Sequence, residues 1–311
     1  MLRQALIPPG SLILSVRCAN GFTRERRRIV LPVPHPSKPI ILHTRYHPPF
    51  NWSALLQFLH SRATPQEWVT ENAYHRLING HQIIVANVPV KNCLSIQIPP
   101  GLSYHANIIL CKTRTLFDLD ANPHIIEAVL SRDLFLHQLI VRHPGLRVPG
   151  CWDNFELLLR VIIGQQISVP GATTTMRRLV DRIGVTPENI AASSPEAIAA
   201  IGMPLKRATT ILRLACMVRS GVLDLHERDQ ELFYQQLVTI PGIGPWTAEY
   251  MCMRALHWPD AFPAGDLGLQ KAGMPGQRQT ERQLIAHASE WKPWRSYATM
   301  LLWKSLENQG G

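Results

Sequence analysis

A tight turn around residue 242 combines residue types that can bind an anion. Within LVTIPGIGPWTA at 237–248, Gly242 and Gly244 bracket Ile243 between two stretches of helical character. Glycine permits backbone conformations and close approaches that a Cβ atom would forbid. The first N–H groups of the second helix lack partners within it, so with the helix dipole they can hold a phosphate without side-chain charge. Thr247 is placed to cap that helix or to reach the phosphate. On this pattern alone, an ordinary connection between two helices remains the alternative.

A single carboxylate, Asp266, lies 22 residues after Gly244 in the loop FPAGDL at 262–267. An aspartate in this position can be the N-cap of the helix that follows. Because a helix N-terminus favours the ionised form of a carboxylate, capping and chemistry are compatible. An ionised carboxylate can stabilise positive charge in a transition state, or orient or deprotonate a water molecule. Both roles stay open at this point.

The chain that must position these residues has 311 amino acids, enough for about two domains. With 46% hydrophobic and 17% charged residues it can bury a large core and lacks the composition of a disordered protein. No apolar run is long enough to span a bilayer. The six cysteines include no C-x-x-C pair, which indicates reduced thiols rather than a zinc site.

The net charge of +10 invites a polyanionic partner, but the charge is unevenly distributed. Residues 1–40 hold seven of the 32 Lys and Arg and only one of the 22 Asp and Glu. We interpret this basic, Pro-rich stretch as a poorly ordered extension or a mis-assigned start, with a targeting peptide as the third reading. The rest of the chain is mildly basic, so the argument for nucleic acid depends on motifs.

Residues 41–118 have the texture of a small domain with mixed helix and strand. Residues 52–61 place apolar side chains at helical spacing, whereas 83–90 is rich in Ile and Val and 94–98 alternates with period two. A Pro-Pro-Gly turn then leads to a further apolar run, 106–111, which we group with the strands. The short connections predict an antiparallel sheet.

From residue 119 to residue 311 the texture is helical. Residues 155–163 are apolar on all sides, which predicts a buried central helix, and Asp153 and Glu156 resemble a capping box at its start. Ser194 and Pro195 are typical of a helix start. Further helices are predicted at 205–218, 232–237, 246–256, 281–290 and 295–306.

Seven ordered segments resemble the helix-hairpin-helix DNA glycosylase superfamily and, within it, the AlkA-type 3-methyladenine DNA glycosylases. They are PPFNWS at 48–53, FDL at 117–119, residues 155–166, GMPLKRA at 202–208, PGIG at 241–244, AGD at 264–266 and WKPWRSYA at 291–298. The resemblance implies an α+β protein. A small antiparallel-sheet α/β domain at 41–118 precedes an all-α helix-hairpin-helix glycosylase domain at 119–311, with the active site between helical subdomains.

The resemblance also implies roles for the chemical residues. Asp266 matches the catalytic carboxylate, and Phe58, Trp246, Tyr250 and Trp303 match a pocket for a base flipped out of the duplex. Without the resemblance, we would assign Trp246 and Tyr250 to a hydrophobic core, because they lie four residues apart on one helical face. Methylation makes a purine electron-poor and cationic, so it stacks well on aromatic rings and departs easily. We therefore expect broad specificity for alkylated purines in double-stranded DNA, with 3-methyladenine and 7-methylguanine as the main substrates.

Two positions refine this expectation. Relatives that also cut the strand carry a lysine where this chain has Trp246, which lacks the amine for a Schiff base, so we expect a monofunctional enzyme that leaves an abasic site. Gln166 stands where the AlkA type can carry a leucine wedge, and it either fills the gap left by the base or is a polar helix-end residue. Gly265 stands where some relatives have a second acid. The expected DNA-binding set comprises Gln165, Gln166, Gly242, Ile243, Gly244 and Thr247.

The remaining expectations concern partners. No cofactor is expected, although the resemblance implies that the backbone of Val238 and Ile240 can hold a monovalent cation. We expect a monomer in the bacterial cytoplasm, associated with the nucleoid and not with a membrane. A glycosylase for another lesion, or a helix-hairpin-helix DNA-binding protein without catalysis, are the alternatives. Four basic residues are either phosphate contacts or solvated charges: Arg62, Lys206, Arg207 and Lys292.

Overall fold

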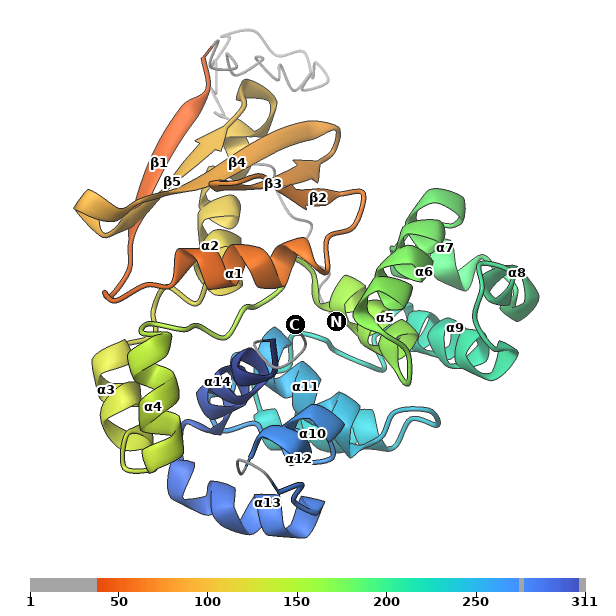
Figure 1. The fold of residues 1–311 in the computed structure, drawn as a ribbon. Coiled ribbons are helices and arrows are strands. Elements are labelled where there is room, and N and C mark those ends of the chain that lie inside the picture. Colours follow the sequence, from red (N-terminus) through yellow and green to blue (C-terminus); the bar gives the residue numbers. More distant parts are fainter. Residues whose placement is uncertain (1–37, 274–276, 308–311) are drawn as a thin grey trace, which may run out of the picture.

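The computed structural model describes residues 38–273 and 277–307, so nearly all of the predicted extension at 1–40 lies outside the described residues. The first domain is built on a five-stranded antiparallel sheet with the spatial order β1-β5-β4-β3-β2 (Figure 1). Its strands are β1 (Ile40–Arg45), β2 (Glu67–Val69), β3 (Ala73–Ile78), β4 (His81–Val88) and β5 (Cys93–Ile98). The prediction of an antiparallel sheet is confirmed.

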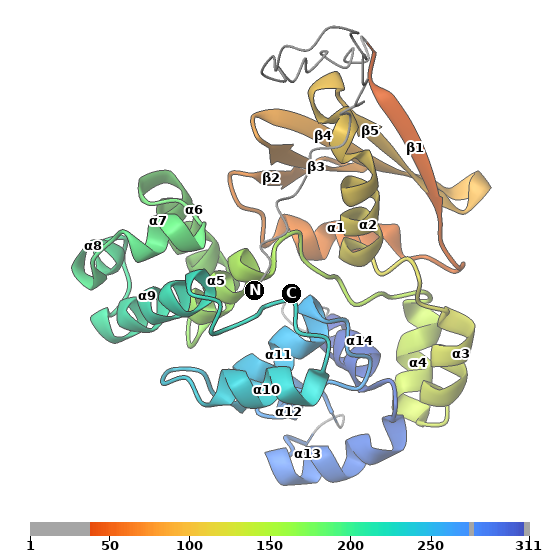
Figure 2. The ribbon, with the colours of Figure 1, turned by 180° about the vertical axis from the view of Figure 1, so that it is seen from behind.

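The sheet buries one face because apolar residues alternate along its central strands. Val85 of β4 lies opposite Ile96 of β5, and both are fully buried. Asn79 and Gly80 join β3 to β4 with positive φ angles of 49° and 77°, the turn geometry that matches the twist of a hairpin. The buried face is covered by α1 (Trp52–His60) and α2 (Ala106–Leu116), which lie between the sheet and the rest of the molecule (Figures 1 and 2).

The assignment of residues 106–111 to the sheet is wrong, because they begin α2. The buried residues of this helix are Ile109, Thr113 and Leu116, which recur at helical spacing. Thr113 is fully buried, and its hydroxyl donates to the carbonyl oxygen of Ile109 at 2.8 Å. This internal bond satisfies the polar group inside the core.

The rest of the described chain is helical and forms two groups, α5–α9 and α10–α14, with α3 and α4 packed beside α14 (Figures 1 and 2). The helices are α3 (Pro123–Leu130), α4 (Leu134–Arg142), α5 (Asn154–Gly164), α6 (Val169–Arg182), α7 (Pro187–Ala191), α8 (Pro195–Ala199), α9 (Leu205–Arg219), α10 (Gln230–Val238), α11 (Pro245–Ala255), α12 (Leu267–Ala272), α13 (Glu281–His287) and α14 (Arg295–Glu307). Three short 3-10 turns complete the elements: η1 (Pro89–Lys91), η2 (Pro100–His105) and η3 (Ala288–Trp291). None of the described helices is long and apolar enough to cross a membrane.

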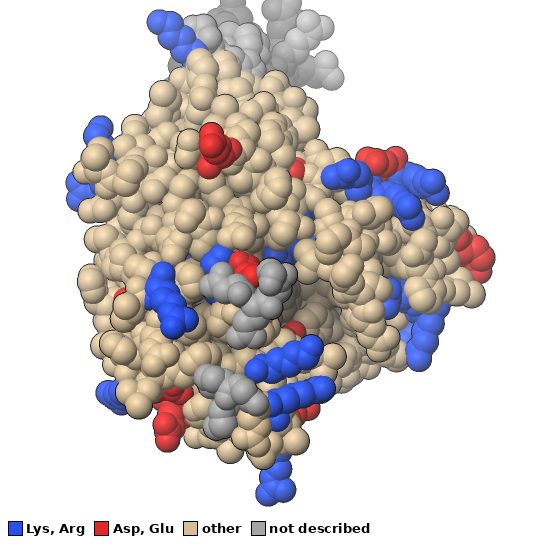
Figure 3. Space-filling view, in the orientation of Figure 1, with Lys and Arg blue, Asp and Glu red and all other residues tan. Residues whose placement is uncertain are grey.

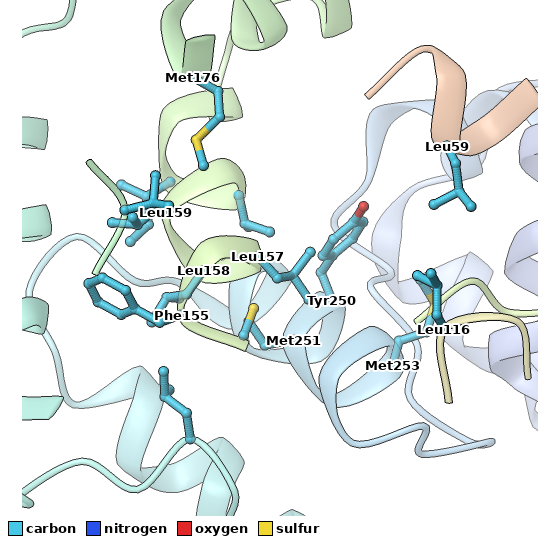
Figure 4. Packing of buried hydrophobic residues seen from close by; sticks show 14 of the residues in the cluster. Leu59, Leu116, Phe155, Leu157, Leu158, Leu159, Met176, Tyr250, Met251 and Met253 are labelled. Carbon is cyan, nitrogen blue, oxygen red and sulfur yellow. The ribbon is translucent and has the colours of Figure 1, made fainter. Parts of the chain in front are cut away.

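Helix α5 is the buried central helix that its composition predicts. Leu158, Leu159, Ile162 and Ile163 are fully buried, and Figure 4 shows the α5 leucines between Met176 of α6 and Met251 of α11. Burial of a side chain of this size stabilises the fold by roughly 1.5–3 kcal/mol.

The predicted capping box at the start of α5 is only half formed. The carboxylate of Asp153 accepts the N–H of Glu156 at 2.9 Å, as an N-cap does. The Glu156 carboxylate does not return this bond and instead pairs with Arg76 of β3 at 2.7 Å. Glu156 therefore ties α5 to the sheet domain.

Candidate active site

The predicted hairpin lies between α10 and α11. Gly242 has a φ of +97°, and a Cβ there would lie 2.4 Å from Oγ1 of Thr210, so this position requires glycine. Gly244 has an ordinary φ of −97° and open space where a Cβ would project. Gly242 is therefore required by its backbone conformation, whereas at Gly244 the missing side chain leaves room for a binding partner.

The end of α5 is joined to this hairpin. The amide nitrogen of Gln165 donates to the carbonyl oxygen of Gly242 at 3.1 Å and to Oγ1 of Thr247 at 3.2 Å. Thr247 is buried, so its hydroxyl holds Gln165 rather than facing solvent. The next residue, Gln166, is exposed and has a φ of 61°, in a region that few non-glycine residues occupy.

Asp266 is the N-cap of α12, so the predicted capping role is confirmed. Its carboxylate also accepts hydrogen bonds from two tryptophans. Its Oδ1 accepts the N–H of Leu269 at 3.0 Å. The indole of Trp303 donates to Oδ1 at 3.2 Å, and the indole of Trp246 donates to Oδ2 at 3.0 Å. The carboxylate is half-buried. Three elements, α11, α12 and α14, therefore meet at one carboxylate.

The aromatic residues predicted for a base pocket extend from this carboxylate toward α1. The rings of Trp246 and Tyr250 are stacked with centroids 5.4 Å apart, and the rings of Tyr250 and Trp303 are 6.0 Å apart and tilted. Figure 4 shows Tyr250 between the leucines of α5 and Leu59 of α1, with its hydroxyl directed toward the α1 side. Phe58 of α1 is buried on that side.

A buried arginine that the sequence interpretation missed connects Phe58 to Tyr250. Arg254 is 4% exposed, and its guanidinium carbon lies 4.9 Å from the Phe58 ring centre and 5.5 Å from that of Tyr250. Its Nη1 donates to the Tyr250 hydroxyl at 2.9 Å, while Nε donates to the carbonyl oxygen of Pro149 at 2.8 Å. Arg254 is four residues after Tyr250 on the same helix, which is the signal that could have identified it.

Arg62 is half-buried and stacks on a predicted pocket residue. Its guanidinium carbon lies 3.8 Å over the ring of Phe58, and Nη1 donates to the Phe58 carbonyl oxygen at 3.2 Å. Burial would raise the pKa of the Tyr250 hydroxyl, but the positive charges of Arg254 and Arg62 outweigh this effect and lower it. The pocket is therefore electropositive beyond Tyr250.

The other predicted basic residues divide between two settings. Arg207 donates from Nη2 to the carbonyl oxygen of Gln165 at 2.7 Å, so it caps the end of α5. Lys206 and Lys292 are exposed and available to a polyanion. In Figure 3, Lys and Arg side chains lie around the hollowed part of the face between the sheet domain and the helices.

The hairpin backbone offers limited ligands for a cation. The carbonyl oxygen of Ile240 accepts the N–H of Ile243 at 2.9 Å, which leaves one lone pair. Within residues 38–273 and 277–307, no three His, Cys, Asp or Glu side chains gather as metal ligands. A cation at the turn would thus be held by backbone oxygens such as those of Val238 and Ile240.

A sheet domain followed by helical groups that present a glycine hairpin and a capped aspartate defines the helix-hairpin-helix class of DNA repair proteins. The family described as AlkA N-terminal domain matches residues 41–153, and the HhH-GPD superfamily of base excision DNA repair proteins matches residues 159–292. DNA-3-methyladenine glycosylase 2 of Escherichia coli K12 is 37% identical over 83% of this chain and 95% of its own length. The chain belongs to this family of DNA-3-methyladenine glycosylases.

Further comparisons agree with this membership. A DNA-3-methyladenine glycosylase of Bacillus subtilis 168 is 33% identical over 61% of this chain and 69% of its own length. The solved structure of a 3-methyladenine DNA glycosylase from Archaeoglobus fulgidus has the same fold, with a TM-score of 0.75 at 22% identity, covering 86% of this chain and 99% of that one. The α+β architecture is confirmed, and the chain is a DNA glycosylase of base excision repair, a hydrolase of N-glycosyl bonds.

Proposed function

We propose that this enzyme is a monofunctional glycosylase that flips alkylated purines out of duplex DNA, excises them and leaves an abasic site. The substrates are 3-methyladenine, 7-methylguanine and similar bases, in keeping with the names of its relatives. The observation that carries the proposal is the Asp266 carboxylate, held by the indoles of Trp246 and Trp303 beside the Tyr250 ring.

This arrangement suits cleavage of an N-glycosidic bond. As the base departs with the bonding electrons, positive charge develops on the deoxyribose, and a fixed carboxylate stabilises it. The tryptophans donate to Asp266 through their N–H groups, and one face of Trp246 packs on Tyr250, so the remaining ring faces are left for a base. An electron-poor methylated purine stacks favourably on such faces. Asp266 thus stabilises the sugar, and the aromatic residues bind the base.

The proposal of a single activity depends on Trp246. It is the second residue of α11, directly beside Asp266, where a strand-cutting relative would present a lysine amine. An indole cannot attack the sugar to form a Schiff base. The reaction therefore stops at the abasic site. The cationic methylated purine leaves with the bonding electrons as a neutral base, and the water that adds to the sugar gives up a proton to solvent.

We propose that the enzyme binds DNA through the hairpin and the end of α5. The exposed backbone at Gly242 and Gly244 binds a phosphate, with a monovalent cation at the Val238 and Ile240 carbonyls as a further aid. Gln166 fills the space left by the flipped base. One monomer suffices for one lesion, and we place the enzyme in the cytoplasm with the nucleoid, where its DNA is.

The test uses purified protein and duplex DNA treated with a methylating agent. Free bases are separated by chromatography, and the same DNA is run on a gel with and without alkali. We expect 3-methyladenine and 7-methylguanine in the supernatant, with nicks only after alkali. Nicks without alkali would refute the single activity, and tight DNA binding without release of a methylated base would refute the substrate class.

A further inference from the structure

Three arginines gather behind Tyr250, on the side away from the Asp266 carboxylate. Arg62 of α1, Arg160 of α5 and Arg254 of α11 all line a cavity of about 40 Å³, which is room for a few water molecules. Arg254 touches the Tyr250 hydroxyl, and Arg62 stacks on Phe58, so the cluster borders the proposed base pocket directly.

The lining of this cavity carries four arginines and three acids, an excess of one positive charge. Arg76, on the same cavity, pairs with Glu67 and Glu156. Within the part of the chain that the structure describes, Arg62, Arg160 and Arg254 form no ion pair with a carboxylate. Nη1 of Arg160 is buried there without a hydrogen-bond acceptor.

The cluster is costly to keep in the interior. Burial, reinforced by the charges of Arg62 and Arg254, lowers the pKa of Arg160 to about 10. Like charges in a poorly solvated region destabilise the fold unless something offsets them. Arg254 is buried, whereas Arg62 and Arg160 are half-buried, so all three cations are at least partly removed from solvent.

We propose that Arg62, Arg160 and Arg254 form an electrostatic sink that stabilises the electrons of the departing base, opposite the carboxylate that stabilises the sugar. When the C1′–N bond breaks, its electron pair moves onto the base nitrogen, and positive charge moves onto the sugar. Positive charge at the base end and negative charge at the sugar end both favour this displacement. Arg62 and Arg160 act on the base through their charge and not by contact with the reacting atoms. This inference rests on the proposed function.

The sink has a signature that depends on the charge of the base. A 7-methylguanine starts cationic and leaves neutral, whereas hypoxanthine starts neutral and leaves as an anion that water then protonates. The charge displaced is the same, so the sink accelerates bond breaking equally for both. Only the cationic base is repelled while it is bound before the reaction. Removing one arginine should therefore slow both bases but tighten the binding of 7-methylguanine alone.

The experiment compares Arg62→Met with wild type in single-turnover base release from duplexes that carry one 7-methylguanine or one hypoxanthine. Met keeps the length and the apolar contact with Phe58. We expect the maximal rate constant to fall about tenfold for both bases, the size expected for one nearby charge at an effective dielectric of a protein surface. The half-saturating enzyme concentration should fall several-fold for 7-methylguanine and stay constant for hypoxanthine.

Three controls separate charge from packing. Arg62→Lys keeps the charge and should stay within about threefold of wild type, since the field and not the shape is conserved. Arg132 is exposed, and Arg132→Met removes the same net charge elsewhere. It should change neither the maximal rate constant nor the half-saturating enzyme concentration for either base. Arg160→Met should reproduce the Arg62→Met pattern more weakly, and it serves if Arg62→Met does not fold.

The outcomes are distinct. Equal losses in rate with unchanged half-saturation for both bases, or equal losses in Arg62→Lys and Arg62→Met, would overturn the sink and leave a structural role. Wild-type enzyme that releases neither base would instead overturn the proposed function, and the sink with it. If only 7-methylguanine is released, its data alone test the sink. Arg62→Met should then lower both the maximal rate constant and the half-saturating enzyme concentration, and any other combination would overturn the sink.

Discussion

Asp266 and Asp118 are two carboxylates of one chain in opposite settings. Asp266 accepts two indole N–H groups and the N–H of Leu269, and it is half-buried. Asp118, at the end of α2, accepts the hydroxyl of Tyr297 at 2.9 Å and the N–H of Val148 at 3.2 Å, and it is 8% exposed. The two carboxylates accept similar hydrogen bonds, so what distinguishes Asp266 from Asp118 is its greater exposure.

The difference lies in what ionisation costs. Burial raises the pKa of Asp118 to about 7, although Tyr297, Arg147 and Val148 act against this rise. Asp118 is thus a polar link in the region where the sheet domain joins the helices. A carboxylate deep in such a joint weakens the fold when it ionises.

The largest expected effect is on catalysis at Asp266. Asp266→Asn keeps the cap and the shape but removes the negative charge that faces the sugar. We expect base release under single-turnover conditions to fall about a thousandfold, with binding to an abasic-site analogue retained. Release within tenfold of wild type would mean that Asp266 does not stabilise the transition state.

The next effect is on stability at Asp118 and depends on pH. A carboxyl pKa raised by folding stabilises the folded state at low pH, and this contribution is lost as pH rises through the folded value of about 7. Asp118→Asn removes this loss. Urea unfolding should therefore show the variant gaining about 2–3 kcal/mol relative to wild type between pH 5 and pH 8.

Nδ1 of His257 lies 3.8 Å from Oδ1 of Asp118, but burial lowers the pKa of His257 to about 4, so in the folded protein its titration lies below the range from pH 5 to pH 8. A stability difference between Asp118→Asn and wild type that is independent of pH would show that Asp118 remains ionised in the folded protein. Base release per folded molecule should not change, because Asp118 has no place in the reaction.

The smallest effect comes from removing one donor at each carboxylate. Trp303→Phe deletes one N–H bond to Asp266 and should slow base release about five- to tenfold, since water can replace part of a charge-assisted bond at a half-exposed site. Its melting temperature should change little. Tyr297→Phe, the matched variant at Asp118, should lower the melting temperature and leave the rate per folded enzyme unchanged. A reversed pattern would break the distinction between the two carboxylates.

Sequence patterns predicted the long periodic elements well. Helix α5 was recognisable because its residues are apolar on all sides, and α11 and α14 because aromatic and aliphatic residues recur along them. The start of α2 was mistaken for a strand because Ile108, Ile109 and Leu110 form an unbroken apolar run, although Ile108 is 56% exposed and Ile109 is buried. The edge strand β1 alternates between covered and exposed residues, but Thr44 is on the covered face and Ile41 is 60% exposed, so hydrophobicity does not follow burial along it.

The site shows the same limit. Asp266 was predicted both as a cap and as the catalytic residue, and the cap is confirmed whereas the catalytic role stays a proposal. The arginine cluster was missed because its contacts are remote in sequence. The four-residue spacing from Tyr250 could have marked Arg254. Its bonds to the carbonyl oxygens of Pro149 and Gly150, about a hundred residues earlier, follow no spacing rule. Local patterns give helices and caps, but only the folded chain shows which charges share a cavity.

The order of the three elements around Asp266 has a consequence for synthesis. Trp246 and Asp266 emerge from the ribosome well before Trp303, which α14 adds to the same carboxylate and to the packing of α4. A nascent chain that already carries the hairpin still lacks the second indole on its carboxylate. Translation therefore supplies the hairpin and Asp266 before the second indole that completes the hydrogen bonds to this carboxylate.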